Sequence, residues 1–200
     1  MMNKVFNFEQ YTPEWWEIRA KKLTASHAQE IGNCGAGLKS YTQKLMQEYY
    51  STAEPDNYSD FHMKRGLELE DSAAFIYSAD MGIEVQKVGF VVLNDYVGCS
   101  PDLLTADGGL CEIKCHADKA HFALILGGSF ESKYAWQAQC QMLITEREYC
   151  DLFSYNPNFG IYSVRKRLYP DPEKFEKLHA GFKMGQKLIE EIERKMDMPS

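Results

Sequence analysis

The segment VGCSPDLLTADGGLCEIK, residues 97–114, decides the expected fold and chemistry of this 200-residue chain. Its pattern predicts a strand followed by a hairpin that an Ala-Asp-Gly-Gly turn closes. Residues two apart on a strand share a face, so Glu112 and Lys114 are expected to project together while Ile113 points into the core. The preceding strand brings Asp102 alongside. Two carboxylates and one ammonium group are therefore expected to converge at one end of a sheet.

This cluster suits the hydrolysis of a phosphodiester. Carboxylates are ligands that Mg²⁺ prefers, and the ion keeps water molecules for contact with a substrate. A divalent cation lowers the pKa of bound water and neutralises charge on a phosphate, and Lys114 is placed to orient that water or to pair with the phosphate. The same hairpin is also an ordinary structural motif, in which Lys114 only balances Glu112 on a solvated face.

Helical and extended patterns surround the hairpin. Helices are expected in a short segment after Thr12, from about Ser26, and over 41–50, 63–81, 133–146 and 171–196. Strands are expected in an antiparallel meander of about three strands over 85–114, and again at 150–157 and 161–169. On the 63–81 helix, Leu67, Ala74 and Tyr77 are expected to share one buried face. The predicted fold class is α/β (α+β), with a central mixed sheet flanked by helices.

We expect a single domain over residues 1–200. Its parts are a helical N-terminal part over about 12–60, a catalytic core over about 61–168 and a C-terminal helix over about 171–196. A chain of this size buries roughly 70% of the surface that its unfolded state exposes, so a core forms without disulfides or structural metals.

Composition limits the class of protein. The net charge of −7 argues against bulk coating of nucleic acid, so contact with DNA is expected to be local. No apolar stretch is long enough to span a bilayer and the N-terminus lacks the apolar region of a signal peptide, which predicts a cytoplasmic protein with no membrane contact. The six cysteines form no CxxC pair and are expected to stay thiols.

Pro101-Asp102 and Glu112-x-Lys114 resemble the catalytic core of the PD-(D/E)xK nuclease superfamily, and with it a restriction-endonuclease-like fold. Further motifs in order along the chain are Trp15-x-x-x-Arg19, Leu23-Thr24-Ala25-Ser26, Gly66 to Glu70, Gly98 to Asp102 and Gln137-x-Gln139. Together they resemble the bacteriophage lambda exonuclease family, the YqaJ-type viral recombinases, over about residues 15–157. Five separated motifs in order are more specific than any one of them.

The resemblance implies roles for the clustered residues. The implied metal ligands are Asp102, Glu112 and the main-chain carbonyl of Ile113. Lys114 is the implied catalytic lysine. Glu70, four residues after Gly66, is implied as a catalytic residue that reaches the metal directly or through water, and Glu68 is the competing choice.

A pocket for a terminal 5′-phosphate is also implied. Its residues are Arg19, Ser26, Ser100 and Gln137. A guanidinium binds phosphate by two hydrogen bonds, and hydroxyl and amide groups add neutral donors. Each has a plainer interpretation, since Arg19 can be a surface charge, Ser26 an N-cap and Gln137 a polar helix residue.

The resemblance implies a Mg²⁺-dependent 5′-to-3′ exodeoxyribonuclease, with Mn²⁺ as the alternative ion and two ions in each active site. Such an enzyme degrades one strand of linear double-stranded DNA from a 5′-phosphorylated end, releases 5′-mononucleotides and leaves 3′ overhangs for recombination by strand annealing. A homotrimeric ring, a single-strand annealing recombinase as partner and a phage or prophage origin in a bacterial cell are also implied. The alternatives are a RecB-like endonuclease or single-strand nuclease, and a catalytically silent DNA-end binding module.

Several other patterns in the sequence give weaker information about function. The sequence contains no GxxxxGK[ST] motif, so we expect that the protein does not use ATP. It also lacks the HExxH motif of zinc proteases. Cys140 and Cys150 lack the close spacing of iron–sulfur ligands, so no such cluster is expected. His116, two residues after Lys114, is near enough to approach a phosphate, although a surface histidine is the simpler interpretation. The basic cluster 165–167 is expected near the site, where it can contact phosphates.

Overall fold

The computed structural model describes residues 4–52 and 61–197, without the side chains of residues 61–64 and 66. The end of the predicted N-terminal part, residues 53–60, lies outside the described residues. The helices are α1 (Pro13–Arg19), α2 (Ala28–Asn33), α3 (Ala36–Tyr50), α4 (Phe61–Met81), α5 (Asp118–Ile125), α6 (Ser132–Thr145) and α7 (Pro172–Met196), with 3-10 turns η1 (Ala25–His27) and η2 (Pro157–Phe159). None of these helices is both long and apolar enough to cross a membrane.

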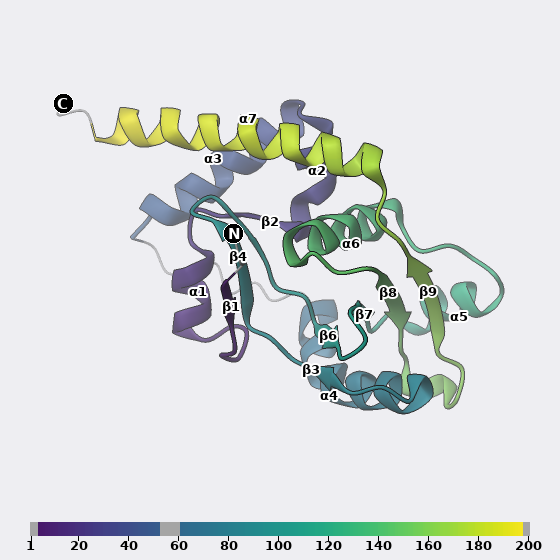
Figure 1. Cartoon of the computed structure of the whole chain (residues 1–200). Helices are drawn as coiled ribbons and strands as arrows, with labels where there is room; N and C mark the ends of the chain where they lie inside the picture. The colour runs from purple at the N-terminus through teal and green to yellow at the C-terminus, as the bar shows by residue number, and fades with distance from the viewer. Residues whose placement is uncertain (1–3, 53–60, 198–200) are drawn as a thin grey trace.

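The strands form two mixed sheets between the helices (Figure 1). One sheet has the order β1-β4-β5-β2 and the other the order β3-β6-β7-β8-β9. The strands of the first are β1 (Lys4–Phe6), β4 (Phe90–Asn94), β5 (Val97–Cys99) and β2 (Leu23–Thr24). The strands of the second are β3 (Val85–Gln86), β6 (Leu103–Thr105), β7 (Leu110–Lys114), β8 (Cys150–Ser154) and β9 (Val164–Leu168). The α/β class is confirmed, and two sheets replace the single central one that the sequence predicts.

The predicted three-strand meander over 85–114 is wrong in its pairing. Five short strands occupy this segment and divide between the two sheets, with hairpins β4–β5 and β6–β7. The chain leaves one sheet after Cys99 and enters the other at Leu103, and Pro101 lies in between. Because proline has no N–H to give to a strand ladder, the continuous pairing ends there. Ser100 and Asp102 therefore lie at the junction of the two sheets.

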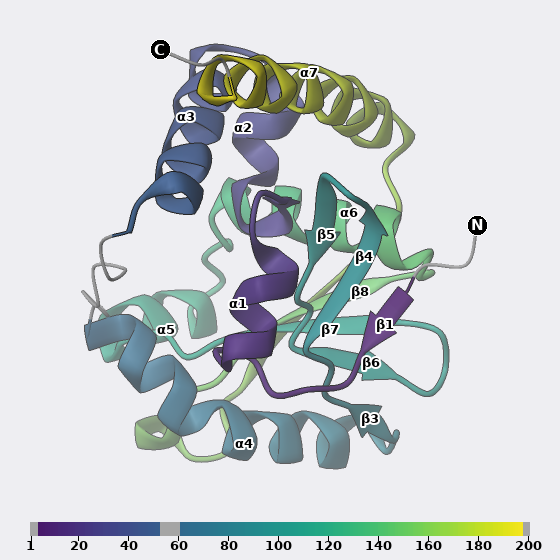
Figure 2. The same cartoon turned by 90° about the vertical axis from the view of Figure 1, so that its left-hand side faces the viewer.

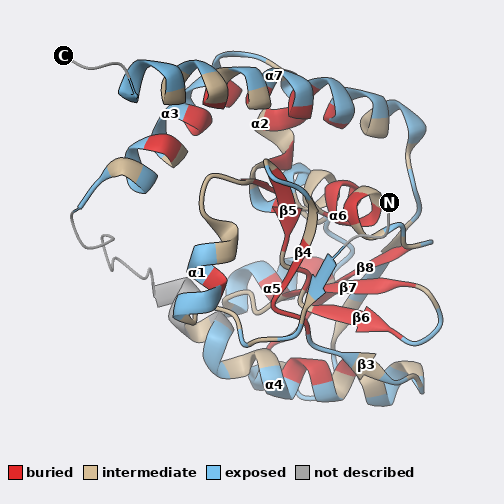
Figure 3. Cartoon of the chain, turned by 60° about the vertical axis from the view of Figure 1, so that its left-hand side comes forward, coloured by how far each residue is buried: buried red, intermediate tan, exposed pale blue. Residues whose placement is uncertain are grey.

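Strand β7 separates two cores by its alternation. Leu110 faces the larger core, which contains α6, whereas Cys111 and Ile113 face a second core with α4. Strand β8 runs parallel beside β7 and is buried along its whole length, as the red strands of Figure 3 show. The expected placement of Ile113 in the core is therefore confirmed, and Glu112 lies on the α6 side.

Two helices cover opposite sides of the molecule. Figure 2 shows α7 along one side, over α2 and α3, and α4 along the other. The predicted C-terminal helix is confirmed, with Asp171 as its N-cap. A Cβ on Gly181 would lie 2.0 Å from the backbone oxygen of Ile31, so only glycine lets α7 approach α2 this closely.

The predicted buried face of α4 is partly wrong. Ala74 and Tyr77 are buried, but Leu67 is exposed. Leu67 lies near the start of α4, beyond the part of the helix that packs on β7, and it lines a pocket instead. Helical periodicity predicts which residues share a face but not how far along the helix the neighbouring layer extends.

Candidate active site

One pocket of about 710 Å³ contains all of the residues that the sequence assigns to a site. They are Arg19, Ser26, Glu70, Ser100, Asp102, Glu112, Ile113, Lys114 and Gln137. They come from α1, η1, α4, the junction between the two sheets, β7 and α6. Segments more than 100 residues apart in sequence thus meet at one end of β7.

The carboxylate pair is anchored to β7. Asp102 Oδ2 accepts a hydrogen bond from the backbone N–H of Ile113 at 2.6 Å, which brings the Asp102 loop beside the strand. Glu112 is only 2% exposed, and its Oε1 accepts from Lys114 Nζ at 2.6 Å. The convergence expected from strand alternation is therefore observed.

The electrostatics of the pair are unbalanced. Burial raises the pKa of Asp102 well above its usual range, and the negative charge of Glu112 raises it further. Burial alone lowers the pKa of Lys114, but the charges of Glu112 and Asp102 outweigh it and the net shift is upward. Lys114 therefore stays an ammonium group, and one cation faces two acids.

Two amides of α6 grip Glu112. Gln137 Nε2 donates to Glu112 Oε1 at 2.7 Å, and Gln141 Nε2 donates to Oε2 at 2.6 Å. Residues four apart share a helix face, so one turn of α6 supplies both donors. Gln141 is fully buried, and its Oε1 has no hydrogen-bond partner among the described residues.

Glu70 lines the pocket and Glu68 does not, so position favours Glu70 of the two candidates. Its Oε1 lies 3.1 Å from Lys87 Nζ, and the same lysine contacts exposed Asp71 at 2.6 Å. Lys87 lies between β3 and β4, so it ties α4 to the segment that joins these strands. The role of Glu70 toward a metal stays a prediction.

Arg19 lines the pocket as a cation that no described acid pairs with. Among the described residues it has no ion pair, and its Cζ lies 4.9 Å from the centre of a Trp15 ring. Burial lowers its pKa, because a desolvated guanidinium lacks compensation. Such a group is suited to an anion that arrives with the ligand.

Ser26 and Ser100 also line the pocket that contains Arg19. Ser100 Oγ accepts from the indole Nε1 of Trp15 at 2.9 Å. Since an indole N–H only donates, the Ser100 proton remains available for another acceptor. Ser26 Oγ lies 3.1 Å from Thr24 Oγ1 and is exposed. Gln137 uses one N–H on Glu112 and keeps a second.

The donor set fits a divalent cation of the Mg²⁺ type. No group of three His, Cys, Asp or Glu side chains among the described residues is arranged to hold a metal. Mg²⁺ typically takes one or two carboxylates and completes its shell with water, and Asp102, Glu112 and the Ile113 carbonyl supply a set of this kind. Burial, and after it the charge of Glu112, raises the pKa of Asp102, and a bound cation would offset both effects.

Sequence reasoning missed Gln141, which contacts Glu112 without lining the pocket, and several residues of the pocket itself. Gln141 could have been found from its i, i+4 spacing with Gln137. Lys114 Nζ lies 4.8 Å from the Tyr134 ring centre, a contact across sequence that no local pattern predicts. Tyr11 and Trp16 also line the pocket, and Tyr11 has a left-handed backbone with φ of 67°. The 165–167 cluster does not line the pocket, because Arg165 and Arg167 pair elsewhere.

Comparison with known proteins finds a similar family model and similar solved structures. The family model described as YqaJ-like viral recombinase domain matches residues 14–148. An alkaline exonuclease from Laribacter hongkongensis, LHK-Exo, has a similar structure, with a TM-score of 0.78 and 31% identity over 92% of this chain and 98% of that one. Its complex with dAMP is similar with a TM-score of 0.80, 31% identity and the same coverage.

A phage-related exonuclease from Haemophilus somnus 129PT has the same fold, with a TM-score of 0.65 and 14% identity over 88% of this chain and 96% of that chain. A comparison with curated proteins gives no match. The solved structures confirm the PD-(D/E)xK fold. The family match and the similarity to the Laribacter exonuclease support a nuclease function.

Proposed function

Since the chain belongs to the YqaJ-like viral recombinase domain family, we propose that it is a Mg²⁺-dependent 5′-to-3′ exodeoxyribonuclease acting on linear duplex DNA. It degrades one strand from a 5′-phosphorylated end and releases 5′-mononucleotides. The observation that carries this proposal is that one pocket joins an uncompensated guanidinium to a carboxylate–lysine cluster. The first group suits a terminal phosphate and the second suits the phosphodiester that follows it.

The terminal phosphate sets the register of the strand. Arg19 binds it through two N–H groups, and Ser100 and Ser26 donate from their hydroxyls. With the end held, the next phosphodiester along the strand lies toward β7. Holding the reacting groups in position accounts for a large part of such rate enhancements.

The acids and the lysine act on the phosphodiester. Asp102, Glu112 and the Ile113 carbonyl would hold Mg²⁺, which when bound supplies charge neutralisation at the phosphate and a more acidic water. Lys114, as an ammonium group, donates hydrogen bonds to the attacking water or to a phosphate oxygen. Gln137 touches Glu112 and also faces the phosphate pocket, so it links the two halves of the site.

The wider assembly follows from the same family membership. We propose a homotrimeric ring around the DNA, Mn²⁺ as a substitute ion, two ions in each site, and a single-strand annealing recombinase that receives the 3′ overhang. A ring suits a chain with a net charge of −7, because enclosure keeps DNA in place without a strongly basic surface. We place the enzyme in the cytoplasm of a bacterial cell, of phage or prophage origin.

The test uses linear duplexes that differ only in a 5′-phosphate or 5′-hydroxyl end, incubated with Mg²⁺. We expect about 10- to 100-fold faster release of mononucleotides from the phosphorylated end, from the hydrogen bonds to a charged group that the hydroxyl end lacks. Lys114→Ala is expected to be inactive, whereas Lys44→Ala, at an exposed lysine on α3, keeps full activity.

Five results would contradict parts of this proposal. Equal rates on both ends remove the phosphate pocket, and full activity of Lys114→Ala removes the catalytic role of that lysine. Cleavage of closed circular DNA indicates a RecB-like endonuclease instead, and cleavage of single strands alone indicates a single-strand nuclease. Binding to DNA ends without a metal-dependent product indicates a silent binding module.

A further inference from the structure

A chain of hydrogen bonds leads from the pocket wall into the core. His116, which lines the pocket, places Nδ1 2.9 Å from Ser154 Oγ. The same Ser154 Oγ lies 2.8 Å from Nδ1 of His121, and Nε2 of His121 lies 2.7 Å from the carbonyl oxygen of Tyr162. Ser154 and His121 are fully buried. None of these three side chains has a role in the proposed mechanism.

The buried end of this series of hydrogen bonds determines which atoms donate and which accept. The Tyr162 carbonyl only accepts, so His121 Nε2 carries a proton. Both ring nitrogens of the fully buried His121 contact neutral groups among the described residues, and a neutral imidazole carries a hydrogen on only one nitrogen. Its Nδ1 is then the acceptor, and the Ser154 hydroxyl group donates a hydrogen bond to it.

The consequence reaches the pocket. Because the hydroxyl group of Ser154 donates its one hydrogen bond to His121, its oxygen accepts a hydrogen bond from His116. His116 therefore carries its hydrogen on Nδ1. Burial lowers the pKa of His116, and the positive charge of Lys114 lowers it further, which favours the uncharged ring at neutral pH. Nε2 of His116 is left with a lone pair and has no hydrogen bond to the described residues.

The surroundings of His116 suit a nucleobase better than a phosphate. Ala117 and Ala120 follow it along the pocket wall, and Tyr134, whose ring centre lies 5.9 Å from that of His116, lines the same pocket. A lone pair repels phosphate oxygens but accepts from an N–H. A base offers an apolar face to such a wall and N–H donors at its edge.

We propose that His116 Nε2 accepts a hydrogen bond from an N–H of the nucleobase at the DNA end, with Ser154 and His121 as positioning residues that fix its tautomer. This contact rests on the proposed function, since it needs a DNA end in the pocket. It also changes the expectation from sequence, in which His116 approached a phosphate.

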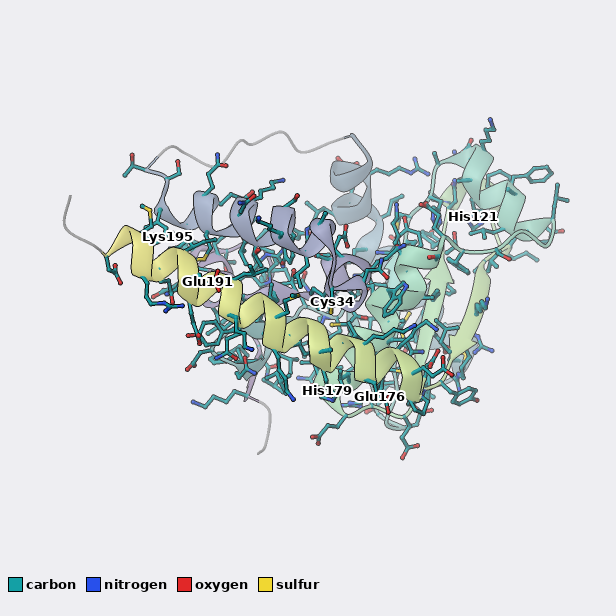
Figure 4. All side chains as sticks on the ribbon, turned by 90° about the horizontal axis from the view of Figure 1, so that it is seen from above. Cys34, His121, Glu176, His179, Glu191 and Lys195 are labelled. Atoms are coloured by element: carbon teal, nitrogen blue, oxygen red, sulfur yellow. The ribbon has the colours of Figure 1, made fainter. Side chains whose placement is uncertain are left out.

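Nitrogen NMR of the ¹⁵N-labelled full-length protein at pH 7.5 tests the tautomer without any catalysis. We expect His116 to carry its proton on Nδ1 in the wild type and to lose that preference in Ser154→Ala. His179 lies on α7, apart from His121 (Figure 4), and is the reference that the substitution leaves unchanged. A wild-type His116 protonated on Nε2 overturns the proposal.

The same spectra test the contact with a base. Titration with dAMP is expected to shift the Nε2 signal of His116, whereas the matched nucleotide with unsubstituted purine, which lacks the 6-amino group, leaves it in place. No shift with dAMP, or equal shifts with both, overturns the contact. These readings need no turnover, so they separate a failure of this inference from a failure of the proposed nuclease activity.

Activity gives an independent reading where the enzyme is active. Two 5′-phosphorylated duplexes are compared, one with adenine and one with unsubstituted purine at the terminal nucleotide. We expect wild type to show about three- to tenfold lower kcat/KM on the purine end, the effect of one hydrogen bond, and His116→Ala to treat both ends alike. Equal preferences in the two proteins overturn the proposal.

Discussion

Two buried carboxylates on neighbouring strands have opposite environments. Asp151 on β8 is fully buried and faces the core with α4, where its oxygens accept from Tyr77 Oη at 2.8 Å, from Arg165 Nη1 at 3.2 Å and from Arg167 Nε and Nη2 at 2.9 and 2.8 Å. Glu112 on β7 faces α6 and shares one ammonium group with a second acid, Asp102.

The difference separates an acid that is compensated within the fold from the acids that we propose bind a metal. Asp151 has two cations and a hydroxyl for one charge and does not line the pocket. Glu112 and Asp102 are two acids with only Lys114 as a paired cation among the described residues, beside a pocket of about 710 Å³. A buried acid with full compensation holds strands together, whereas an under-compensated pair next to open volume is ready for an incoming cation.

The largest expected effect is on catalysis at Glu112. Glu112→Gln keeps the size of the side chain but removes a charge that would hold Mg²⁺, so the rate of mononucleotide release should fall on the order of 10³-fold. Single-turnover digestion of linear duplex measures it. A fold that is intact by circular dichroism is required, and an activity within tenfold of wild type would contradict the assignment.

Asp151→Asn should instead act on stability. Loss of the charge leaves Arg165 and Arg167 without their acid, and because both arginines are partly exposed we expect a loss of about 1–3 kcal/mol in the free energy of unfolding. Thermal unfolding measures the loss. Below its melting temperature the variant should digest DNA at close to the wild-type rate, so a catalytic defect without a stability defect would reverse the distinction between the two acids.

Gln141→Leu tests the support of Glu112. The variant leaves Glu112 Oε2 without its buried donor, and loss of such an orienting contact typically costs about 10- to 100-fold in metal affinity or activity. Gln139→Leu is the matched control on the same helix, because Gln139 bonds to the backbone at Tyr169 and Asp171 instead. Equal losses of activity in the two variants would indicate a general packing effect.

The smallest effect concerns stability without metal. The pKa of Asp102 is raised in the folded state, so the folded protein holds this proton to higher pH than the unfolded chain. Stability in EDTA should therefore decrease as pH rises above the unfolded pKa of an aspartate and toward the raised value. Asp102→Asn should flatten this dependence in thermal unfolding between pH 4 and 7.5, and an unchanged slope would argue against the repulsion.

Local pattern predicted the parts of the site that depend on one element. Period-two alternation placed Glu112 and Lys114 on one face with Ile113 opposite, and apolar spacing with a capping aspartate predicted α7. The ordered motifs of the family brought Arg19 and Gln137 into consideration, and the structure places both in the pocket.

The errors and omissions are non-local. Which sheet a short strand joins depends on partners distant in sequence, so the meander was wrong. Asp151 meets Arg167 only because β8 and β9 pair in a register that sets these residues opposite each other. The hydrogen bond from Gln141 to Glu112 likewise requires α6 to pack so that Gln141 lies beside this residue of β7. Sequence pattern gives faces, and tertiary packing decides which faces meet.

The central claim is that the acids of the pocket, and not buried acids in general, hold a divalent cation. Mn²⁺ titration followed by electron paramagnetic resonance tests it, because the sharp signal of free Mn²⁺ is lost on binding. Wild type and Glu48→Gln, which removes an exposed acid of α3, are expected to bind the ion, whereas Asp102→Asn and Glu112→Gln are expected to leave it free. Binding that is equal in all four proteins, or absent from wild type, would contradict the account.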